Sequence, residues 1–310
     1  MQNTKSISVI IPTYNGKELL KQYLPSCIRA LEFSTLIFEY EIIVVDDCSK
    51  DDTITFLKNE YPQIILLKNE TNLGFSKTIN KGIRYSKMDL SLLLNNDMEL
   101  PEDYFEKTIP FFIGNQNLFG VSSQIRDKSG KNVLEGAKKL QRKHGMFHYK
   151  DCLESSLGRT LYVCGGNALV DSVKLKMLGG FNELFSPFYF EDFDLSLRAW
   201  RNGWNLLYTD QTYCKHCHST TILKENNKED VERIFLRNKI LINYLNNSKM
   251  DNFKMTFYLS VKFLLSYIAP SKSKLAYRNG MKDFFKLYKD AKRLRQKEYV
   301  ILPLLEENLF

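Results

Sequence analysis

Short apolar runs and amphipathic stretches take turns along the first hundred residues. Apolar residues run together and then stop at polar ones in four places, which predicts buried strands at Ile7–Ile11, Tyr40–Val45, Ile64–Leu67 and Leu90–Leu94. Between these runs apolar residues recur every three or four positions, which predicts helices over Lys17–Phe33, Thr53–Glu60 and Phe75–Tyr85. Apolar strands that alternate with helices favour an α/β fold, in which helices cover both faces of a mostly parallel sheet.

Polar residues follow three of the predicted strands, at the point where each strand ends. These segments are Thr13-Tyr14-Asn15, Asp46-Asp47 and Asn95-Asn96-Asp97. The carboxyl ends of parallel strands meet at one edge of a sheet, and ligands bind outside that edge. We therefore expect a binding site there.

The pattern is less regular after Pro101 and changes again near Thr221, where an extension rich in helical spacing begins. Its helices are predicted over Asp230–Asn247, Phe253–Ile268 and Lys274–Lys297. Between Lys249 and Lys297 thirteen basic residues face three acidic ones, a surplus of ten that exceeds the net charge of +8 of the whole chain. Together with the aromatic residues of the middle helix, this charge favours an interfacial element on an anionic membrane surface.

Two interpretations other than membrane binding are open for the basic extension. Its helices could instead pack on the preceding domain, with the charged face in solvent, because aromatic stripes at helical spacing are usually core. Such charge also suits nucleic acid, but no base-reading module accompanies it, and nucleic acid is not expected as a partner.

Composition narrows the class of protein. A chain of 310 residues with 44% apolar and 26% charged residues is neither disordered nor a small disulfide scaffold. The six cysteines are scattered, and the first residues do not resemble a signal peptide, so free thiols and a cytoplasmic location are expected. No window of 18 uncharged apolar residues exists, so no membrane-spanning helix is predicted.

Two cysteines and two histidines lie close together near the end of the predicted domain. Cys214-Lys215-His216-Cys217-His218 matches the spelling of a haem-attachment motif, but that chemistry requires export, which nothing at the start of the chain directs. A zinc site would need four ligands, and no second pair of Cys or His residues lies nearby. We expect a strand edge that carries one functional histidine, His216.

The strand ends offer oxygen ligands but no glycine-rich phosphate loop of either common type. A phosphate ligand would therefore need another counter-charge, which a divalent metal held by Asp97 and His216 could supply. Oxygen ligands suit Mg²⁺ or Mn²⁺, and one imidazole favours Mn²⁺. The alternative is that Asp97 only caps the loop before Pro101.

A dense acidic group, Glu191-Asp192-Phe193-Asp194, lies among aromatic residues. Partial burial raises the pKa of a carboxyl group toward the range useful to a general base. The same residues could serve as the acidic cap of a helix over Leu195–Arg201. Both functions can coexist, because neighbouring residues can take different roles.

Six segments, in order over Ser8–Ser219, resemble the family-2 type of glycosyltransferase. They are Ser8–Gly16, Val44–Thr53, Asn72–Gly82, Leu92–Asp97, Gly165–Ala168 and Phe190–Leu195. The second is similar to a V-D-D-x-S-x-D-x-T signature and the third to an N-x-G-x₅-N-x-G segment. In the fourth, at the position of a D-x-D motif, Asn95 replaces the first Asp, which leaves one negative charge fewer for a metal ion.

The resemblance implies a GT-A fold, a Rossmann-like mixed, mostly parallel sheet flanked by helices, with a C-terminal helical extension. It implies a catalytic domain at residues 1–220, whose nucleotide-binding part is 1–100 and whose acceptor-binding part is 101–220, followed by a basic extension at 221–310. The expected activity is inverting transfer of a sugar from a nucleotide-sugar to a glycan or lipid-linked acceptor, as in bacterial rhamnosyl- and galactosyl-type transferases of polysaccharide and cell-envelope assembly.

The resemblance also implies roles for individual residues. Asp192 is the catalytic base, Glu191 is the second residue expected to be catalytic, and Asp97 and His216 hold Mn²⁺ or Mg²⁺ on the donor diphosphate. Asp46 hydrogen-bonds the base, and Thr13, Tyr14 and Asn15 line the nucleoside pocket. The remaining residues expected at the nucleotide-sugar are Pro12, Asp47, Asn72, Gly74, Lys77, Asn80, Asn95 and Asn96. Those expected at the acceptor are Gly165, Gly166, Asn167 and Trp204.

Two other functions share this fold. A nucleotidyltransferase that makes activated sugars would need a basic phosphate loop after the first strand, and Thr13–Lys17 is a poor one. A non-catalytic glycan-binding protein would be favoured by loss of Asp97 or Asp192, and both are present. UDP-, dTDP- and GDP-linked sugars all remain open as donors, and a peripheral position on the inner face of the cell membrane is expected.

Overall fold

The computed structural model describes residues 4–154, 156–216, 227–268 and 271–297. The chain forms two compact units. The sheet unit comprises Met1–Lys138, Asp151–Pro187 and Glu191–His218, and the helical unit comprises Lys139–Lys150, Phe188–Phe190 and Ser219–Phe310. The predicted boundary at 220/221, together with Cys217 and His218, lies outside the described residues.

The sheet unit begins with the alternation of strands and helices that the apolar pattern predicts. The first elements are β1 (Lys5–Thr13), α1 (Lys17–Phe33), β2 (Ile37–Asp46), α2 (Thr53–Glu60), β3 (Ile65–Lys68), α3 (Phe75–Tyr85), β4 (Leu90–Leu94) and β5 (Met98–Glu99). Then come α4 (Tyr104–Thr108), the 3₁₀ turn η1 (Ile109–Phe112), β6 (Leu118–Arg126), β7 (Val133–Glu135), β10 (Gly158–Arg159), β11 (Asn167–Asp171), α5 (Ser172–Met177), the turn η2 (Glu183–Phe185), α6 (Glu191–Arg201) and β12 (Asn205–His216).

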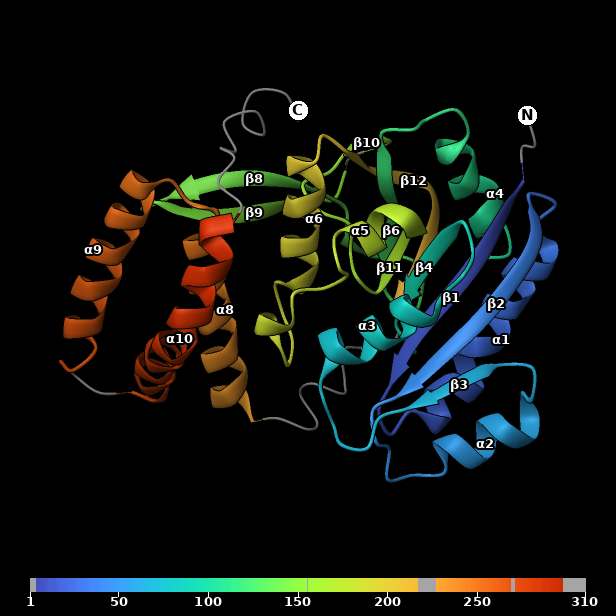
Figure 1. The fold of residues 1–310 in the computed structure, drawn as a ribbon, viewed down its shortest axis with the longest axis horizontal. Helices are drawn as coiled ribbons and strands as arrows, with labels where there is room; N and C mark the ends of the chain where they lie inside the picture. Colours follow the sequence, from blue (N-terminus) through green and yellow to red (C-terminus); the bar gives the residue numbers. More distant parts are fainter. Residues whose placement is uncertain (1–3, 155, 217–226, 269–270, 298–310) are drawn as a thin grey trace. The chain divides into compact units, whose positions relative to one another are not determined.

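The sheet is mixed and mostly parallel, with the order β10-β12-β6-β11-β4-β1-β2-β3 (Figure 1). Strands β4, β1, β2 and β3 are parallel neighbours. Strand β11 is antiparallel to both β4 and β6, whereas β12 pairs with β6 in parallel. Two short strands sit at the margin, since β5 pairs with β12 and β7 with β6.

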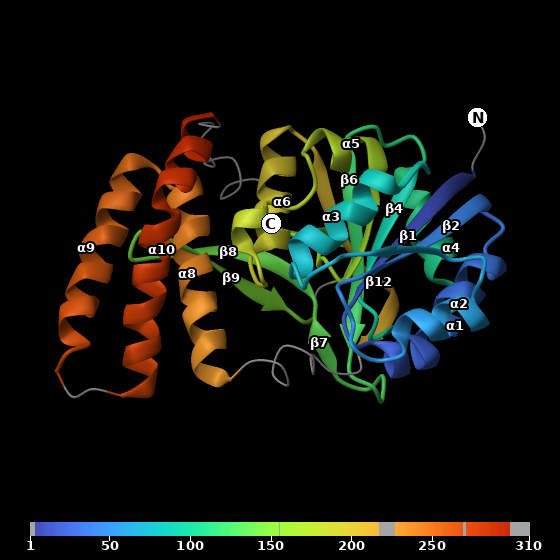
Figure 2. The same cartoon turned by 60° about the horizontal axis from the view of Figure 1, so that its bottom comes forward.

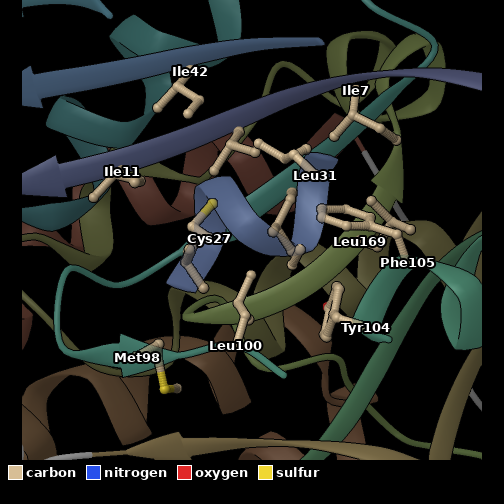
Figure 3. Packing of buried hydrophobic residues seen from close by; sticks show 14 of the residues in the cluster. Ile7, Ile11, Cys27, Leu31, Ile42, Met98, Leu100, Tyr104, Phe105 and Leu169 are labelled. Atoms are coloured by element: carbon tan, nitrogen blue, oxygen red, sulfur yellow. The ribbon is translucent and has the colours of Figure 1, made fainter. Parts of the chain in front are cut away.

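Side chains of β1 enter both cores, which explains the unbroken apolar run. Ile7, Val9 and Ile11 pack into the cluster that contains α1, which Figure 3 shows from close by. Ile10 faces the opposite cluster, which contains residues of α3. Helix α3 approaches so closely that a Cβ on Gly82 would lie 2.4 Å from Cγ2 of Ile10, so this helical position requires glycine.

The helical unit contains α8 (Lys228–Asn246), α9 (Lys249–Leu265) and α10 (Lys272–Lys297), which lie side by side in both views (Figures 1 and 2). It also includes the tip of the hairpin of β8 (Ala137–Lys143) and β9 (Met146–Cys152). The tip is tied to the helices, because Phe147 N donates to Asn243 Oδ1 and Arg142 forms an ion pair of 3.0 Å with Asp251.

The predicted fold class is confirmed, and the predicted bounds of α1, α2, α3 and β4 coincide with the observed ones. The predicted start of α6 was wrong. The helix begins at Glu191 rather than Leu195, so both carboxylates lie in its first turn. None of the described helices is long and apolar enough to cross a membrane.

Candidate functional site

Loops at the carboxyl ends of β1 and β2 form the first part of the site. Asp46, the last residue of β2, is buried; its Oδ2 accepts a hydrogen bond from Ser49 N (3.0 Å), while its buried Oδ1 has no partner among the described residues. Asn15 adopts a left-handed conformation (φ 48°), accepts from Lys50 N (2.8 Å) and donates through its own N to Ser49 Oγ (2.8 Å). The two loops are thereby locked together, and one carboxylate oxygen stays available to a donor.

Asp47 acts differently from its neighbour. Its Oδ1 accepts from Asn69 Nδ2 (2.9 Å) and Leu73 N (2.8 Å), and its Oδ2 accepts from Gly74 N (2.9 Å). The side chain therefore fixes the loop before α3. Of the residues predicted there, Asn72 is exposed, Gly74 has a positive φ of 80°, and Lys77 is half-buried on α3.

The segment after β4 is held on both sides. Asn96 Nδ2 donates to Thr13 Oγ1 (2.8 Å), which joins it to the end of β1, where Pro12 and Tyr14 are half-buried. Asn95 N donates to Gly166 O (3.1 Å), and a Cβ on Gly166 would lie 2.5 Å from Nδ2 of Asn95. Gly166 thus leaves room for the side chain of Asn95, which a larger residue at this position would displace.

Asp97 and His216 meet at the next step of this segment. His216 Nε2 lies 3.1 Å from Asp97 Oδ2, because β5 and β12 pair in the register that sets His216 opposite Met98. Burial lowers the pKa of His216, but the hydrogen bond and charge of Asp97 outweigh it and raise the pKa above its usual value. Asp97 Oδ1 is buried without a hydrogen-bond partner in the described part of the chain.

These two side chains fit a divalent ion. They offer one imidazole and one carboxylate with an unused buried oxygen, a donor set that suits Mn²⁺ or Mg²⁺. Within the described ranges no group of three or more His, Cys, Asp and Glu side chains could hold a metal ion. Any ion here would therefore need further ligands from outside the described side chains, such as water or a bound diphosphate.

Glu191 and Asp192 begin α6. Asp192 Oδ1 accepts from Phe193 N (2.7 Å) and its Oδ2 accepts a long hydrogen bond from Gly165 N (3.4 Å). Burial is the main cause that raises the pKa of Asp192 to about 6. Burial and the charge of Asp192 raise the pKa of Glu191 well above its usual range, and Glu191 Oε2 is a buried atom without a described partner.

Adjacent glycines connect the two groups of acidic residues. Gly166 O accepts from Asn95 N, two residues before Asp97, while Gly165 N donates to Asp192. The fold thus brings Asp97, His216 and Asp192 to one region of the sheet unit.

Glu135 and Lys138 belong to the same region, and no sequence motif marks them. Lys138 Nζ lies 2.9 Å from Glu135 Oε2 and also pairs with Asp151, and its side chain is only 4% exposed. The charge of Glu135 contributes to the raised pKa of both Asp192 and His216, whereas Lys138 lowers the pKa of Asp192. Electrostatic coupling therefore joins this pair to both halves of the site.

Three predicted ligand contacts fall on side chains that the fold already uses. Asn80 bonds to the backbone of Phe181 through both its amide nitrogen and its oxygen (2.8 Å each). Asn167 is fully buried, accepts from Tyr104 Oη (2.9 Å) and donates to Ser123. Trp204 stacks on Phe119 with 6.1 Å between ring centroids. These side chains support the site structurally, and their contacts with ligands stay predictions.

Comparison with known proteins gives a family and a fold. The family model described as Glycosyl transferase family 2 matches residues 8–178, more than half of the chain. An uncharacterized glycosyltransferase of Haemophilus influenzae is 32% identical over 112 residues, 36% of each chain. Dolichyl-phosphate beta-glucosyltransferase ALG5A of Trichomonas vaginalis is 33% identical over 106 residues, 32% of this chain and 33% of that one. The match thus spans about a third of the length of these relatives.

Solved structures share the fold. The crystal structure of GalNAc-T7 with UDP, GalNAc and Mn²⁺ superposes with a TM-score of 0.63 at 16% identity, over 94% of this chain and 57% of that one. The structure of residues 1–349 of S. aureus TarS in complex with UDP-GlcNAc superposes with a TM-score of 0.60 at 18% identity, over 93% of this chain and 83% of that one. At these identities the likeness concerns the fold alone.

Proposed function

Because the chain belongs to glycosyl transferase family 2, we propose that it transfers a sugar from a nucleotide-sugar to a hydroxyl group of a glycan or lipid-linked acceptor. The observation that carries the proposal is the link through Gly165 and Gly166, which joins the segment of Asp97 to Asp192. Sugar transfer needs charge stabilisation at the leaving diphosphate and a base at the attacking hydroxyl, and the two groups are suited to these tasks.

In this proposal the nucleotide lies at the ends of β1 and β2, where the free Oδ1 of Asp46 accepts a hydrogen bond from the base. The diphosphate lies toward Asp97 and His216, which would hold Mn²⁺ or Mg²⁺. When bound, such an ion would stabilise the negative charge that develops on the leaving diphosphate.

Asp192 takes the proton of the acceptor hydroxyl in this proposal. Its pKa of about 6 leaves it ionised at neutral pH yet more basic than an ordinary aspartate. The oxygen attacks the anomeric carbon as the bond to the diphosphate breaks, and the proton passes to Asp192. Direct displacement from the side opposite the leaving group inverts the anomeric centre, and no second nucleophile is needed.

The names of similar proteins support the choice of ligands. One relative is a dolichyl-phosphate glucosyltransferase, which supports a lipid-linked acceptor, and one structural neighbour contains UDP and Mn²⁺. We propose residues 1–100 as the nucleotide-binding part, 101–220 as the acceptor-binding part, and a peripheral position at an anionic membrane surface on the cytoplasmic side, in polysaccharide assembly.

A two-stage experiment tests the proposal. First, a thermal-shift screen of UDP-, dTDP- and GDP-linked sugars with and without Mn²⁺ identifies the donor, because a ligand that binds only the folded state raises its melting temperature. Second, transfer or hydrolysis of that donor is measured for Asp192→Asn and for the matched control Asp210→Asn, an exposed aspartate of β12. Loss of turnover only in Asp192→Asn, with donor binding retained, supports the proposal, and full turnover of that variant contradicts it.

A further inference from the structure

A cavity of about 220 Å³ lies inside the helical unit, between the hairpin tip and the three helices. Its lining residues are Lys143, His144, Met146, His148, Leu236, Lys239, Ile240, Tyr258, Leu259, Lys262 and Tyr277. We call it the basic cavity. Since one water occupies about 30 Å³ of liquid volume, the space accommodates a group much larger than a single water.

Positive charge without a counter-charge distinguishes the basic cavity. Three lysines and two histidines line it, and none of its described lining residues is acidic. The nearby Asp251 is already paired with Arg142 at 3.0 Å. Lys239 and His148 are half-buried, whereas Lys143, His144 and Lys262 are exposed at the rim of the cavity. A half-buried lysine with no acidic residue among the described lining fits an anionic ligand.

Local geometry supports this conclusion. His148 Nε2 is a buried atom with no hydrogen-bond partner among the described residues, so it can donate to a ligand when it carries the proton. Burial, Lys239, Lys143 and His144 all lower the pKa of His148, and burial and Lys262 lower the pKa of Lys239. The neighbouring positive groups thus disfavour the protonated forms of His148 and Lys239, and a bound anion would offset that effect.

Aromatic rings hold part of the wall in place. His144 stacks on Tyr258 with 4.4 Å between centroids and an interplanar angle of 3°. Lys262 Nζ lies 5.9 Å from the centroid of the Tyr258 ring and 5.3 Å from that of Tyr277. Tyr277 Oη in turn donates to Leu259 O (3.1 Å), which fixes α10 against α9. The basic groups are therefore displayed by a packed framework.

The surface beside the basic cavity is apolar. Met250, Phe253, Phe257, Val261 and Leu264 recur every three or four residues along α9 and are 42–70% exposed, so they form one unpaired face of the helix. Tyr258 and Lys262 follow Phe257 and Val261 directly, which places the cavity wall on the adjoining row. A free anion would leave this apolar face in solvent. A lipid that carries a phosphate matches both the basic cavity and the apolar face.

We propose that the basic cavity binds the phosphate group of a lipid, with the exposed face of α9 against its hydrocarbon chain. The inference rests on the proposed function in one respect, since it assigns the lipid-linked acceptor of that function to this binding site. Binding itself requires no sugar transfer. The phosphate could belong to a membrane phospholipid or to a polyprenyl carrier, and both share the chemistry that this site recognises.

The test is flotation of the full-length chain with vesicles, in the absence of any donor. Vesicles contain phosphatidylcholine alone, with phosphatidic acid, or with polyprenyl phosphate, and inorganic phosphate is titrated separately. Lys239→Gln/Lys262→Gln is compared with Lys289→Gln/Lys292→Gln, which makes the same charge change at exposed positions of α10. Circular dichroism and melting temperature check that each variant is folded.

We expect vesicles that contain phosphatidic acid or polyprenyl phosphate to bind more strongly than zwitterionic phosphatidylcholine alone, and the cavity variant to bind them at least about tenfold more weakly, since each basic residue near an anionic lipid surface contributes about 1 kcal/mol. The exposed control should lose less. Preference for polyprenyl phosphate identifies the carrier as the source, and equal binding of polyprenyl phosphate and phosphatidic acid identifies lipids with a terminal phosphate in general. Equal losses in the two variants, or binding of inorganic phosphate with no vesicle binding, overturn the proposal.

A second variant separates this site from the chemistry. Asp192→Asn should bind the same vesicles as the native chain, and Lys239→Gln/Lys262→Gln should still hydrolyse a soluble donor. Failure of the proposed function would therefore leave vesicle binding intact, and failure of the lipid site would leave hydrolysis intact. A variant Phe257→Ser/Leu264→Ser should lose vesicle binding too, and its unchanged binding would overturn the part assigned to α9.

Discussion

Asp97 and His216 form a hydrogen-bonded pair at 3.1 Å across 119 residues of sequence. Their meeting depends on the short strand β5, which directly follows Asp97 and pairs with the end of β12. The pair leaves one buried carboxylate oxygen unused, and the raised pKa of His216 reports the negative charge beside it. The two residues thus make a small site that is electrostatically prepared for a cation.

Replacing Asp97 tests this site. Asp97→Asn should weaken the Mn²⁺-dependent binding of the donor nucleotide by roughly tenfold to a hundredfold, because a carboxylate ligand and its charge are lost. Isothermal titration with Mn²⁺ present and with chelator measures the effect. Glu99→Gln is the matched control, since Glu99 lies on the same short strand and pairs with Lys215. A similar loss in both variants would argue against a metal ligand at Asp97.

The activity should depend on pH through Asp192. A base must be deprotonated, and its pKa is raised to about 6, so at saturating Mn²⁺, where His216 stays deprotonated, kcat/KM should be constant at neutral pH and fall about tenfold per unit below pH 6. Rates measured from pH 4.5 to 8.5 check this. An acidic limb centred near pH 4, the ordinary value for aspartate, would mean that the base is not this carboxyl group.

Glu135 and Lys138 should shift that acidic limb in opposite directions. Lys138→Met removes a cation that lowers the pKa of Asp192, so the limb should move to higher pH by about half a unit to one unit. Glu135→Gln removes an anion that raises the same pKa, so the limb should move to lower pH. Lys138→Arg keeps the charge and should restore the native profile. Shifts of the same sign for the first two variants would contradict the electrostatic role.

Asp47 should matter for stability more than other aspartates of the same region. Asp47→Ala leaves the backbone N–H groups of Leu73 and Gly74 without this acceptor and removes one of the two acceptors of Asn69 Nδ2, at a cost of about 2–4 kcal/mol in the free energy of unfolding. Asp52→Ala is the control, because Asp52 is exposed and its side-chain partner among the described residues is Lys17 at the surface, a contact worth less than about 1 kcal/mol. Urea denaturation compares the two, and equal costs would refute the difference.

The local pattern of apolar and polar residues was sufficient to predict these helices and strands and the fold class. The bounds of α1, α2, α3 and β4 agree with the apolar periodicity, because these segments bury the faces that their own spacing creates. The polar strand ends were likewise visible, and they are joined as expected, with Asn96 bonded to Thr13 and Asn15 to the loop after Asp46. The beginning of α6 escaped this reasoning, because acidic residues in a first turn look the same as a cap outside it.

The tertiary structure decided what depends on contacts between distant residues. The antiparallel insertion of β11 between β4 and β6 and the register of β5 on β12 follow from non-local pairing, which periodicity does not encode. Glu135 and Lys138 belong to no motif. They matter because the charge of Glu135 raises the pKa of Asp192 and His216, and that of Lys138 lowers the pKa of Asp192. The basic cavity is similar. Its lysines are far apart in the sequence, and the hairpin tip and three helices gather them around one space with no carboxylate among the described residues of its wall. The sequence shows the apolar periodicity of helices and strands directly. Whether a charged group has an oppositely charged neighbour depends on distances in three dimensions, which only the folded chain defines.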